Sequence, residues 1–131
     1  MGSSTSSSNK KPEARVLNEC KQVLEFLKSR KLLDYWRINT TGIPLGPSKF
    51  RPNDAAGFSD LFILVDALVL FVELKSTHGQ QSVSQKEFEK RVTKYGHVYR
   101  ICKGAEELIA LLIEVSPKLQ LLLPTRKSNR A

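Results

Sequence analysis

The stretch GFSDLFILVDALVLFVELKST, residues 57–77, decides the fold of this chain. It contains two apolar runs, Leu61–Val65 and Leu68–Leu74, which are rich in Val, Ile, Leu and Phe and are separated by only two residues. Such a pattern predicts a β-hairpin, and its nearly continuous apolar character predicts that both faces of the hairpin are buried. Charged residues nevertheless stand just before the first run and at the end of the second. Their position requires a chemical explanation.

The register of this hairpin determines which charged side chains meet. If residues 66 and 67 form a two-residue turn, the pairing carries Asp60 to a position opposite Glu73, with Cβ atoms ~5 Å apart. Lys75 lies two residues beyond Glu73 and therefore shares its face of the sheet. The Asp-Ala turn lacks the Gly that favoured two-residue turns contain, and a slip of one residue would separate the three charges.

Two carboxylates at this distance repel each other, and each is driven towards protonation unless a cation joins them. A hard divalent ion such as Mg²⁺ binds one or two carboxylates and keeps water and substrate phosphate as its other ligands. The backbone carbonyl of Leu74 can add a ligand, and Lys75 can orient or help to deprotonate an attacking water. These groups suit metal-assisted phosphodiester hydrolysis. The structural alternative is an Asp–Lys or Glu–Lys ion pair at a strand end, worth ~0–1 kcal/mol where it is exposed.

Three helices and two further strands are expected around the hairpin. Residues 12–30 place apolar side chains at steps of three and four, which predicts an amphipathic helix with Pro12 in its first turn. The remaining predicted elements are strands at residues 33–40 and 98–102 and helices at residues 82–95 and 105–115. The order α-β-β-β-α-β-α predicts an α/β fold, in which helices flank a mixed (α+β) sheet.

A long connection, residues 39–57, joins the first predicted strand to the hairpin. It contains three Gly and three Pro without apolar periodicity, and connections of this length are usually functional or mobile. Lys49 and Arg51 lie in its middle, where they are candidate DNA-binding residues. The alternative is a disordered insertion.

The helix expected at residues 82–95 carries a polar residue on its inward stripe. Gln85 follows Ser82 by three positions, the spacing of a capping box, in which the amide bonds back to the backbone of the N-cap residue. Gln85 also shares a stripe with apolar residues, so its amide can instead hold the catalytic Lys or the attacked phosphate. Three lysines at steps of four form either a rail for a DNA backbone or a solvated face: Lys86, Lys90 and Lys94.

The composition of the 131 residues is that of a soluble globular domain, with 40% hydrophobic and 26% charged residues. The net charge of +8 favours a polyanionic partner, although part of the excess lies in the terminal tails. The longest apolar runs are far shorter than the ~20 residues of a membrane helix, and the start lacks the apolar segment of a secretory signal. We therefore expect an intracellular protein without a membrane span, in which Cys20 and Cys102 are buried thiols.

Three motifs in the chain resemble the VRR-NUC domain, a branch of the PD-(D/E)xK nuclease superfamily found in stand-alone viral proteins and in the Fanconi-anaemia-associated nuclease. They are GFSDL, then VELK after ten intervening residues, and then SVSQKEF. EARVL in the first helix and WRINTTG before the long connection extend the resemblance over about residues 13–112. The Asp…Glu-x-Lys core alone is a loose motif, and its combination with S-x-x-Q and the flanking helix is fairly specific.

The resemblance implies a PD-(D/E)xK restriction-endonuclease-like core and a Mg²⁺- or Mn²⁺-dependent DNA endonuclease. We expect the nuclease domain at residues 12–116, between a disordered tail at residues 1–11 and a basic tail at residues 117–131. Small stand-alone members of the family look like homodimers that act on branched, Holliday-junction-like DNA. A viral member would work in the host cytoplasm, and a member from a eukaryotic host in the nucleus.

The resemblance also assigns roles to single positions. The family's catalytic residues fall on Asp60, Glu73, Lys75 and Gln85. Asp60 and Glu73 are the implied metal ligands, and the family's first-helix Glu, which helps to hold the metal or its water, falls on Glu13, with Glu19 as the competing position. Ser59 stands where a Pro commonly precedes the Asp, and Ser is an accepted variant there.

Two other functions are compatible with the same residues. A non-catalytic DNA-binding module of the same fold would keep the carboxylates only as vestiges, and a measurement of metal binding separates it from an enzyme. A basic interaction subunit would dock an acidic protein, and it would show no salt-dependent affinity for DNA.

Overall fold

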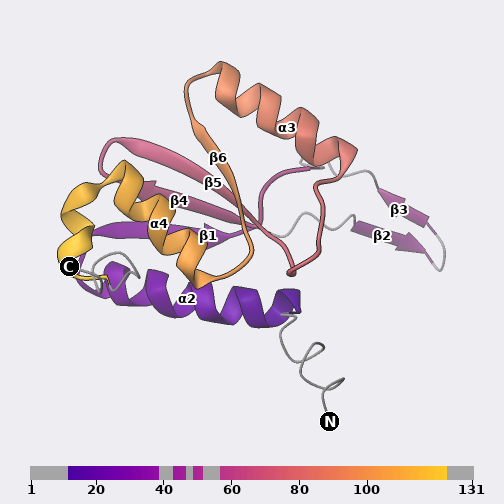
Figure 1. The fold of residues 1–131 in the computed structure, drawn as a ribbon. Helices are drawn as coiled ribbons and strands as arrows, with labels where there is room; N and C mark the ends of the chain where they lie inside the picture. The colour runs from indigo at the N-terminus through magenta and orange to yellow at the C-terminus, as the bar shows by residue number, and fades with distance from the viewer. Residues whose placement is uncertain (1–11, 39–42, 47–48, 52–56, 124–131) are drawn as a thin grey trace, which may run out of the picture.

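The computed structural model describes residues 12–38, 43–46, 49–51 and 57–123, and its main body is a four-stranded sheet with helices on both faces (Figure 1). The elements, in chain order, are α2 (Glu13–Ser29), β1 (Leu33–Arg37), β2 (Ile43–Gly46), β3 (Lys49–Arg51), β4 (Leu61–Val65), β5 (Leu68–Leu74), α3 (Val83–Lys94), β6 (Val98–Cys102), α4 (Ala105–Val115) and the 3-10 helix η1 (Pro117–Leu121). The expected order of helices and strands is confirmed, and β2, β3 and η1 are additions to it.

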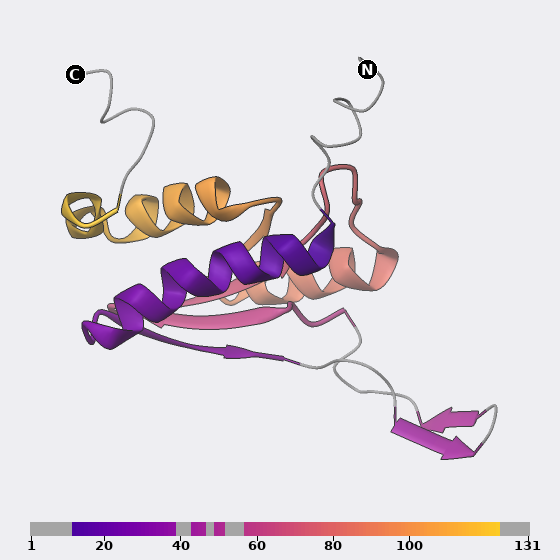
Figure 2. The same cartoon turned by 90° about the horizontal axis from the view of Figure 1, so that it is seen from below.

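The sheet is mixed, with the strand order β1-β4-β5-β6. β4 runs antiparallel to both β1 and β5, whereas β5 and β6 are parallel because the chain crosses over through α3 between them. α2 and α4 lie side by side on one face (Figure 2), and α3 covers the part of the other face formed by β5 and β6. No helix in the described part of the chain has the length and apolar character needed to cross a membrane.

The larger core lies between the sheet and the α2–α4 pair. α2 contributes the stripe that its sequence predicts, with four fully buried side chains: Val16, Cys20, Leu24 and Leu27. They pack against the inner face of the hairpin and against the buried leucines of α4. Cys20 and Cys102 are both buried cysteine thiols, as expected.

The hairpin has the predicted register, in which Val65 pairs with Leu68 and Leu61 pairs with Val72. Asp66 adopts a φ of 52° at the turn. This left-handed conformation costs Asp less than most residues, because its short polar side chain can bond to nearby backbone. Asp66 therefore adopts the positive φ that a Gly would usually provide in a two-residue turn.

Burial on both faces, which we expect for the whole hairpin, is found only in β5. Residues of β4 alternate between buried and more exposed positions, and Leu64 keeps 37% of its surface exposed. The reason is that α3 packs a second, smaller cluster against β5 and β6 and leaves the outer face of β4 partly uncovered. Phe71, Phe88 and Tyr99 are the main aromatic residues of this cluster.

The connection between β1 and β4 contains β2 and β3, which pair with each other as a separate two-stranded sheet (Figure 2). The sequence does not predict them. Runs of this length are too short to display alternation, and Pro44 within β2 argues against a strand.

The folded chain extends beyond residue 116, so the boundary expected there is too early. Leu119 of η1 is fully buried, and it joins the larger core together with Leu123. Lys118 Nζ lies 3.0 Å from Asp66 Oδ1, which also ties η1 to the turn of the hairpin. The basic residues after residue 123 favour a tail in the sequence, although Leu119 and Leu123 lie four positions apart, which is a spacing typical of a helix.

Replacing Leu119 with Ala should lower the free energy of unfolding by ~2–5 kcal/mol, because the substitution leaves a cavity in the core. Leu121 lies in the same 3-10 helix with 91% of its surface exposed, so Leu121→Ala is a matched control that should change stability by no more than ~0.5 kcal/mol. Urea denaturation of the full chain measures both values. Equal effects of the two substitutions would contradict the placement of η1 in the core.

Candidate active site

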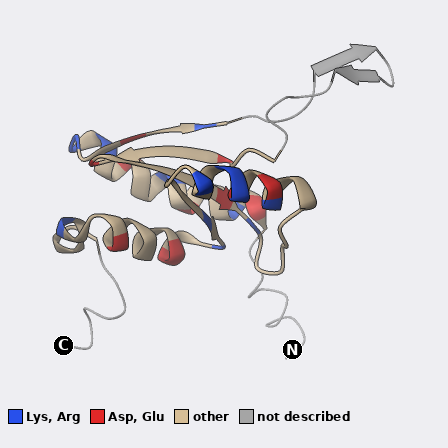
Figure 3. Ribbon diagram, turned by 90° about the horizontal axis from the view of Figure 1, so that it is seen from above, with Lys and Arg blue, Asp and Glu red and all other residues tan. Residues whose placement is uncertain are grey.

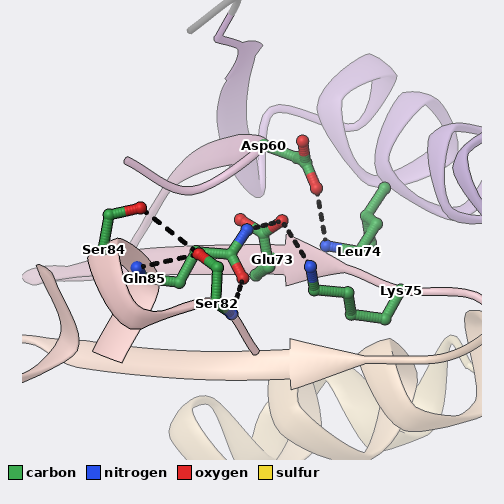
Figure 4. A network of polar contacts seen from close by, with 7 residues as sticks. All are labelled: Asp60, Glu73, Leu74, Lys75, Ser82, Ser84 and Gln85. Carbon is green, nitrogen blue, oxygen red and sulfur yellow. Dashed lines mark hydrogen bonds and ion pairs between the residues drawn. The ribbon is translucent and has the colours of Figure 1, made fainter. Parts of the chain in front are cut away.

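The start of β4 and the end of β5 lie at the same end of the sheet, and the expected polar residues gather there (Figure 4). Asp60 immediately precedes β4. Its Oδ2 accepts a 2.8 Å hydrogen bond from the backbone N–H of Leu74, and its carbonyl oxygen accepts one of 2.8 Å from the N–H of Ile38. Asp60 is therefore held from both sides, by the chain that leaves β1 and by the end of β5.

Gly57 holds the segment before Asp60 against the start of α3. Its φ is +83°, and a Cβ at this position would lie 2.2 Å from the carbonyl oxygen of Ser84. Glycine is the residue that accepts both this conformation and this close approach of two backbones. The ring of Phe58 then packs on that of Phe88, with 4.6 Å between the centroids, and continues the contact along α3.

Glu73 carries a buried carboxylate, with only 4% of the residue exposed. Its Oε2 accepts a 2.8 Å hydrogen bond from Nε2 of Gln85 and lies 3.8 Å from Nζ of Lys75. Its Oε1 is also buried, and no described residue donates a hydrogen bond to it. Burial, and after it the negative charge of Asp60, raises the pKa of Glu73 to about 8, against the opposing effect of Lys75. A buried oxygen without a partner is costly, so this carboxyl is suited to bind a proton or a cation.

Gln85 combines the two roles that its sequence position allows. Its Oε1 accepts a 2.8 Å hydrogen bond from the backbone N–H of Ser82. The backbone N–H of Gln85 donates to Oγ of Ser82 at 3.2 Å, which completes the capping box of α3. With the amide oxygen held in this way, the amide nitrogen points at Glu73. Of the two partners expected for the amide, Lys75 or the attacked phosphate, the structure shows neither, and the amide nitrogen donates to the carboxylate of Glu73.

A cavity of about 360 Å³ opens beside this cluster, between the first turn of α2 and the end of the sheet. Its lining residues include Glu13, Asn18, Arg37, Asp60 and Leu74. Asp60 lines the cavity and lies close enough to Glu73 to raise the pKa of its carboxyl, so the cavity borders the polar cluster around Glu73.

The cavity distinguishes the two glutamates considered for α2. Glu13 lines it, and the charge of Glu13 adds to the causes that raise the pKa of Glu73. Glu19 does not line the cavity, and its Oε2 lies 3.3 Å from Nε of Arg15 in an ion pair along the helix. Glu13 is therefore the helix carboxylate that faces the site.

The described residues contain no group of three or more His, Cys, Asp or Glu side chains arranged to hold a metal ion. Mg²⁺ does not need such a group, since it is commonly held by one or two carboxylates and completes its shell with water and phosphate oxygens. Asp60 and Glu73 supply two carboxylates, and the Oε1 of Glu73 has no partner among the described residues. Leu74, whose carbonyl is the third expected ligand, lies at the cavity. This donor set fits a hard divalent cation.

The candidate DNA-binding residues are not among the described residues that line the cavity. The three lysines of α3, Lys86, Lys90 and Lys94, are all exposed. The same helix carries both basic and acidic positions (Figure 3). Lys49 and Arg51 belong to β3 by their backbone, and their side chains fall outside the described part of the structure.

Sequence reasoning does not identify Arg37 as a residue of the site. Its only signal is its place in WRINTTG, and a single Arg at the end of a strand has no pattern that separates it from a solvated surface residue. Its position at the cavity depends on the packing of α2 against the sheet.

The raised pKa of Glu73 predicts how stability depends on pH. The folded state keeps this proton up to about pH 8, whereas the unfolded state releases it near its ordinary value of 4.5, so the contribution of Glu73 falls as pH rises between these values. In EDTA, the free energy of unfolding of the parent should therefore fall relative to that of Glu73→Gln as pH rises, by at most ~1.4 kcal/mol per pH unit.

The control is Glu114→Gln. Arg100 lowers the pKa of Glu114, so its stabilisation is present throughout the range above pH 4.5 and is lost only at lower pH. Its difference from the parent should stay constant from pH 6 to pH 9. Urea denaturation at several pH values measures the free energy of unfolding of both variants and the parent. If the difference between Glu73→Gln and the parent is also independent of pH, the pKa of Glu73 is not raised by burial and repulsion.

No family model matches this chain, and neither a curated protein nor a solved structure matches it. The candidate site is therefore defined by the residues and their geometry.

Proposed function

We propose that this chain is a Mg²⁺- or Mn²⁺-dependent DNA endonuclease with a PD-(D/E)xK core, which hydrolyses phosphodiester bonds in branched, Holliday-junction-like DNA. The observation that carries the proposal is the carboxylate of Glu73. It is buried at the end of an apolar hairpin, it has an oxygen without a partner among the described residues, and it is repelled by Asp60. A proton on Glu73, with a hydrogen bond to Asp60, relieves the repulsion when no cation is bound, and a divalent cation would relieve it with both carboxylates ionised.

The residues around the carboxylates have separate roles in this proposal. Asp60, Glu73 and the carbonyl of Leu74 would hold the cation, which supplies Lewis-acid polarisation of a phosphoryl oxygen when bound. Gln85 orients Glu73 through its amide nitrogen. Lys75 lies on the same side of the site as Glu73, where its ammonium group can hold the attacking water and offset the charge of the phosphate.

Glu13 faces the cavity from the first turn of α2, on the other side of Asp60. Its carboxylate is suited to accept a hydrogen bond from water held in the cavity. A site built from rigid strands and helices keeps such groups at fixed distances, which suits the positioning that hydrolysis requires.

The charge distribution supports a nucleic acid as the substrate. The net charge is +8, and the exposed lysines of α3 follow one flank of the helix whose N-terminal end carries Gln85. Contacts from such lysines to phosphates release counterions and favour binding without regard to sequence. The choice of branched DNA and of a homodimeric enzyme follows from the resemblance to VRR-NUC domains alone.

The deciding experiment is cleavage of a labelled four-way junction, with matched linear duplex and single-stranded DNA, in Mg²⁺, Mn²⁺ or EDTA. We expect metal-dependent cutting by the parent chain. The variants Asp60→Asn, Glu73→Gln and Lys75→Met should each lower the single-turnover rate constant ~10²-fold or more, because each removes a group that contacts the reacting atoms or their cation. The exposed carboxylate of Glu87 on α3 provides the control, since Glu87→Gln should cut like the parent.

The other outcomes separate the competing functions. Salt-dependent binding without cutting in any metal would favour a non-catalytic DNA-binding module. Neither binding nor cutting would favour a subunit that docks an acidic protein. Preference for linear DNA would retain the nuclease and reject the junction.

A second prediction concerns Lys49 and Arg51. Replacing both with Gln should weaken DNA binding by ~1–3 kcal/mol and leave metal affinity unchanged, since neither residue is expected to touch the cation. Titration of DNA and of Mn²⁺ into the double variant measures the two affinities separately. Unchanged affinity for DNA would rule out this role for β3.

A further inference from the structure

We infer that Arg37 is a phosphate-binding residue of the site, which grips the substrate phosphodiester on the side of Asp60 that faces α2. This inference rests on the proposed function and adds a residue to it. Arg37 ends β1, its side chain is exposed, and it lines the same cavity as Asp60 and Glu13. It is the cationic residue among those that line this cavity.

The backbone of Arg37 is rigidly placed relative to Asp60. Arg37 pairs with Leu61 in the β1–β4 ladder, and the N–H of the next residue, Ile38, donates a 2.8 Å hydrogen bond to the carbonyl oxygen of Asp60. The two residues are thus neighbours across adjacent strands at the end of the sheet. A backbone held in this way loses less conformational entropy on binding than the backbone of a loop.

The guanidinium group of Arg37 has no partner in the described part of the structure that would compete with a ligand. It makes no hydrogen bond or ion pair with any described residue, although Asp60 and Glu13 line the same cavity. A planar guanidinium binds two oxygens of one phosphate at once, a geometry that suits a phosphodiester better than a single carboxylate at a distance. Without Arg37, the charged residues that line this side of the cavity would all be carboxylates, which repel a polyanion.

Arg37 and Lys75 approach Asp60 from different directions. Lys75 lies with Glu73 and Gln85 on the α3 side of the sheet, and Arg37 lies on the α2 side. A phosphodiester that reaches the carboxylates therefore meets a cation on each side. Lys75 is close to the carboxylate of Glu73, whereas Arg37 is free to bind the non-bridging phosphate oxygens.

The test measures DNA binding in EDTA, so that it reads the contact without metal or turnover. Arg37→Gln in the full chain should weaken binding of a four-way junction ~10-fold or more, as expected for loss of a charged hydrogen-bond pair. It should also reduce the slope of log affinity against log salt concentration by about one phosphate contact. Arg37→Lys should recover the slope and only part of the affinity, because Lys binds phosphate as a point charge.

Arg15→Gln is the matched control. Arg15 lies on α2 near the same cavity, carries the same charge and is paired with Glu19, and it does not line the cavity. This variant should change the affinity for DNA far less than Arg37→Gln does. A similar loss for both variants would reduce the effect of Arg37 to general electrostatic attraction, and would overturn the inference.

Neutral methylphosphonate groups, introduced one at a time into the junction, identify the contact. One position should weaken binding by the parent and have no further effect on Arg37→Gln, because the two changes remove the same interaction. If every position affects the parent and Arg37→Gln equally, Arg37 touches no phosphate and the inference fails.

The binding results are independent of the cleavage results. A parent chain that binds but does not cut would reject the nuclease, and the methylphosphonate series would still decide the role of Arg37. A parent chain that cuts, with Arg37→Gln unchanged in affinity and salt slope, would reject Arg37 alone. A parent chain that binds no DNA would reject both.

Discussion

The buried carboxylate of Glu73 is the constraint on which this end of the molecule depends. Taking a carboxylate out of water next to a second one is unfavourable, and removal of its partners leaves the charge uncompensated. The fold supplies those partners from elements distant in sequence, with Gln85 from α3 and Lys75 from the chain just after β5. No residue in the described part of the structure donates a hydrogen bond to the remaining oxygen.

Backbone geometry supports the arrangement at two points. The left-handed Gly57 lets the chain approach the carbonyl of Ser84, which brings the segment that leads to Asp60 against the start of α3. The capping box fixes the amide of Gln85 by its oxygen, so that its nitrogen can face Glu73. A single helix N-terminus therefore serves both as a structural cap and as part of the site.

The larger core and the polar cluster lie on different faces of β5. The larger core packs apolar side chains of α2, α4 and η1 on one face of the strands, and this packing continues past residue 116 through Leu119 and Leu123. The polar cluster lies where β5 ends, and the unfavourable burial of the Glu73 carboxyl beside Asp60 is confined to that place. A fold of this kind tolerates a locally unfavourable site because the apolar core provides the compensating free energy.

The sequence by itself determined the elements of the main body, the register of the hairpin and the meeting of Asp60 and Glu73 at its end, because these follow from local periodicity and a two-residue turn. It left open which helix carboxylate faces the site and what the amide of Gln85 contacts, and it did not identify Arg37 as a residue of the cavity. Only the tertiary structure decided these points, together with the open face of β4 and the burial of η1. Each depends on how segments far apart in the chain pack against one another, and a periodic pattern within one segment carries no information about its neighbours in space.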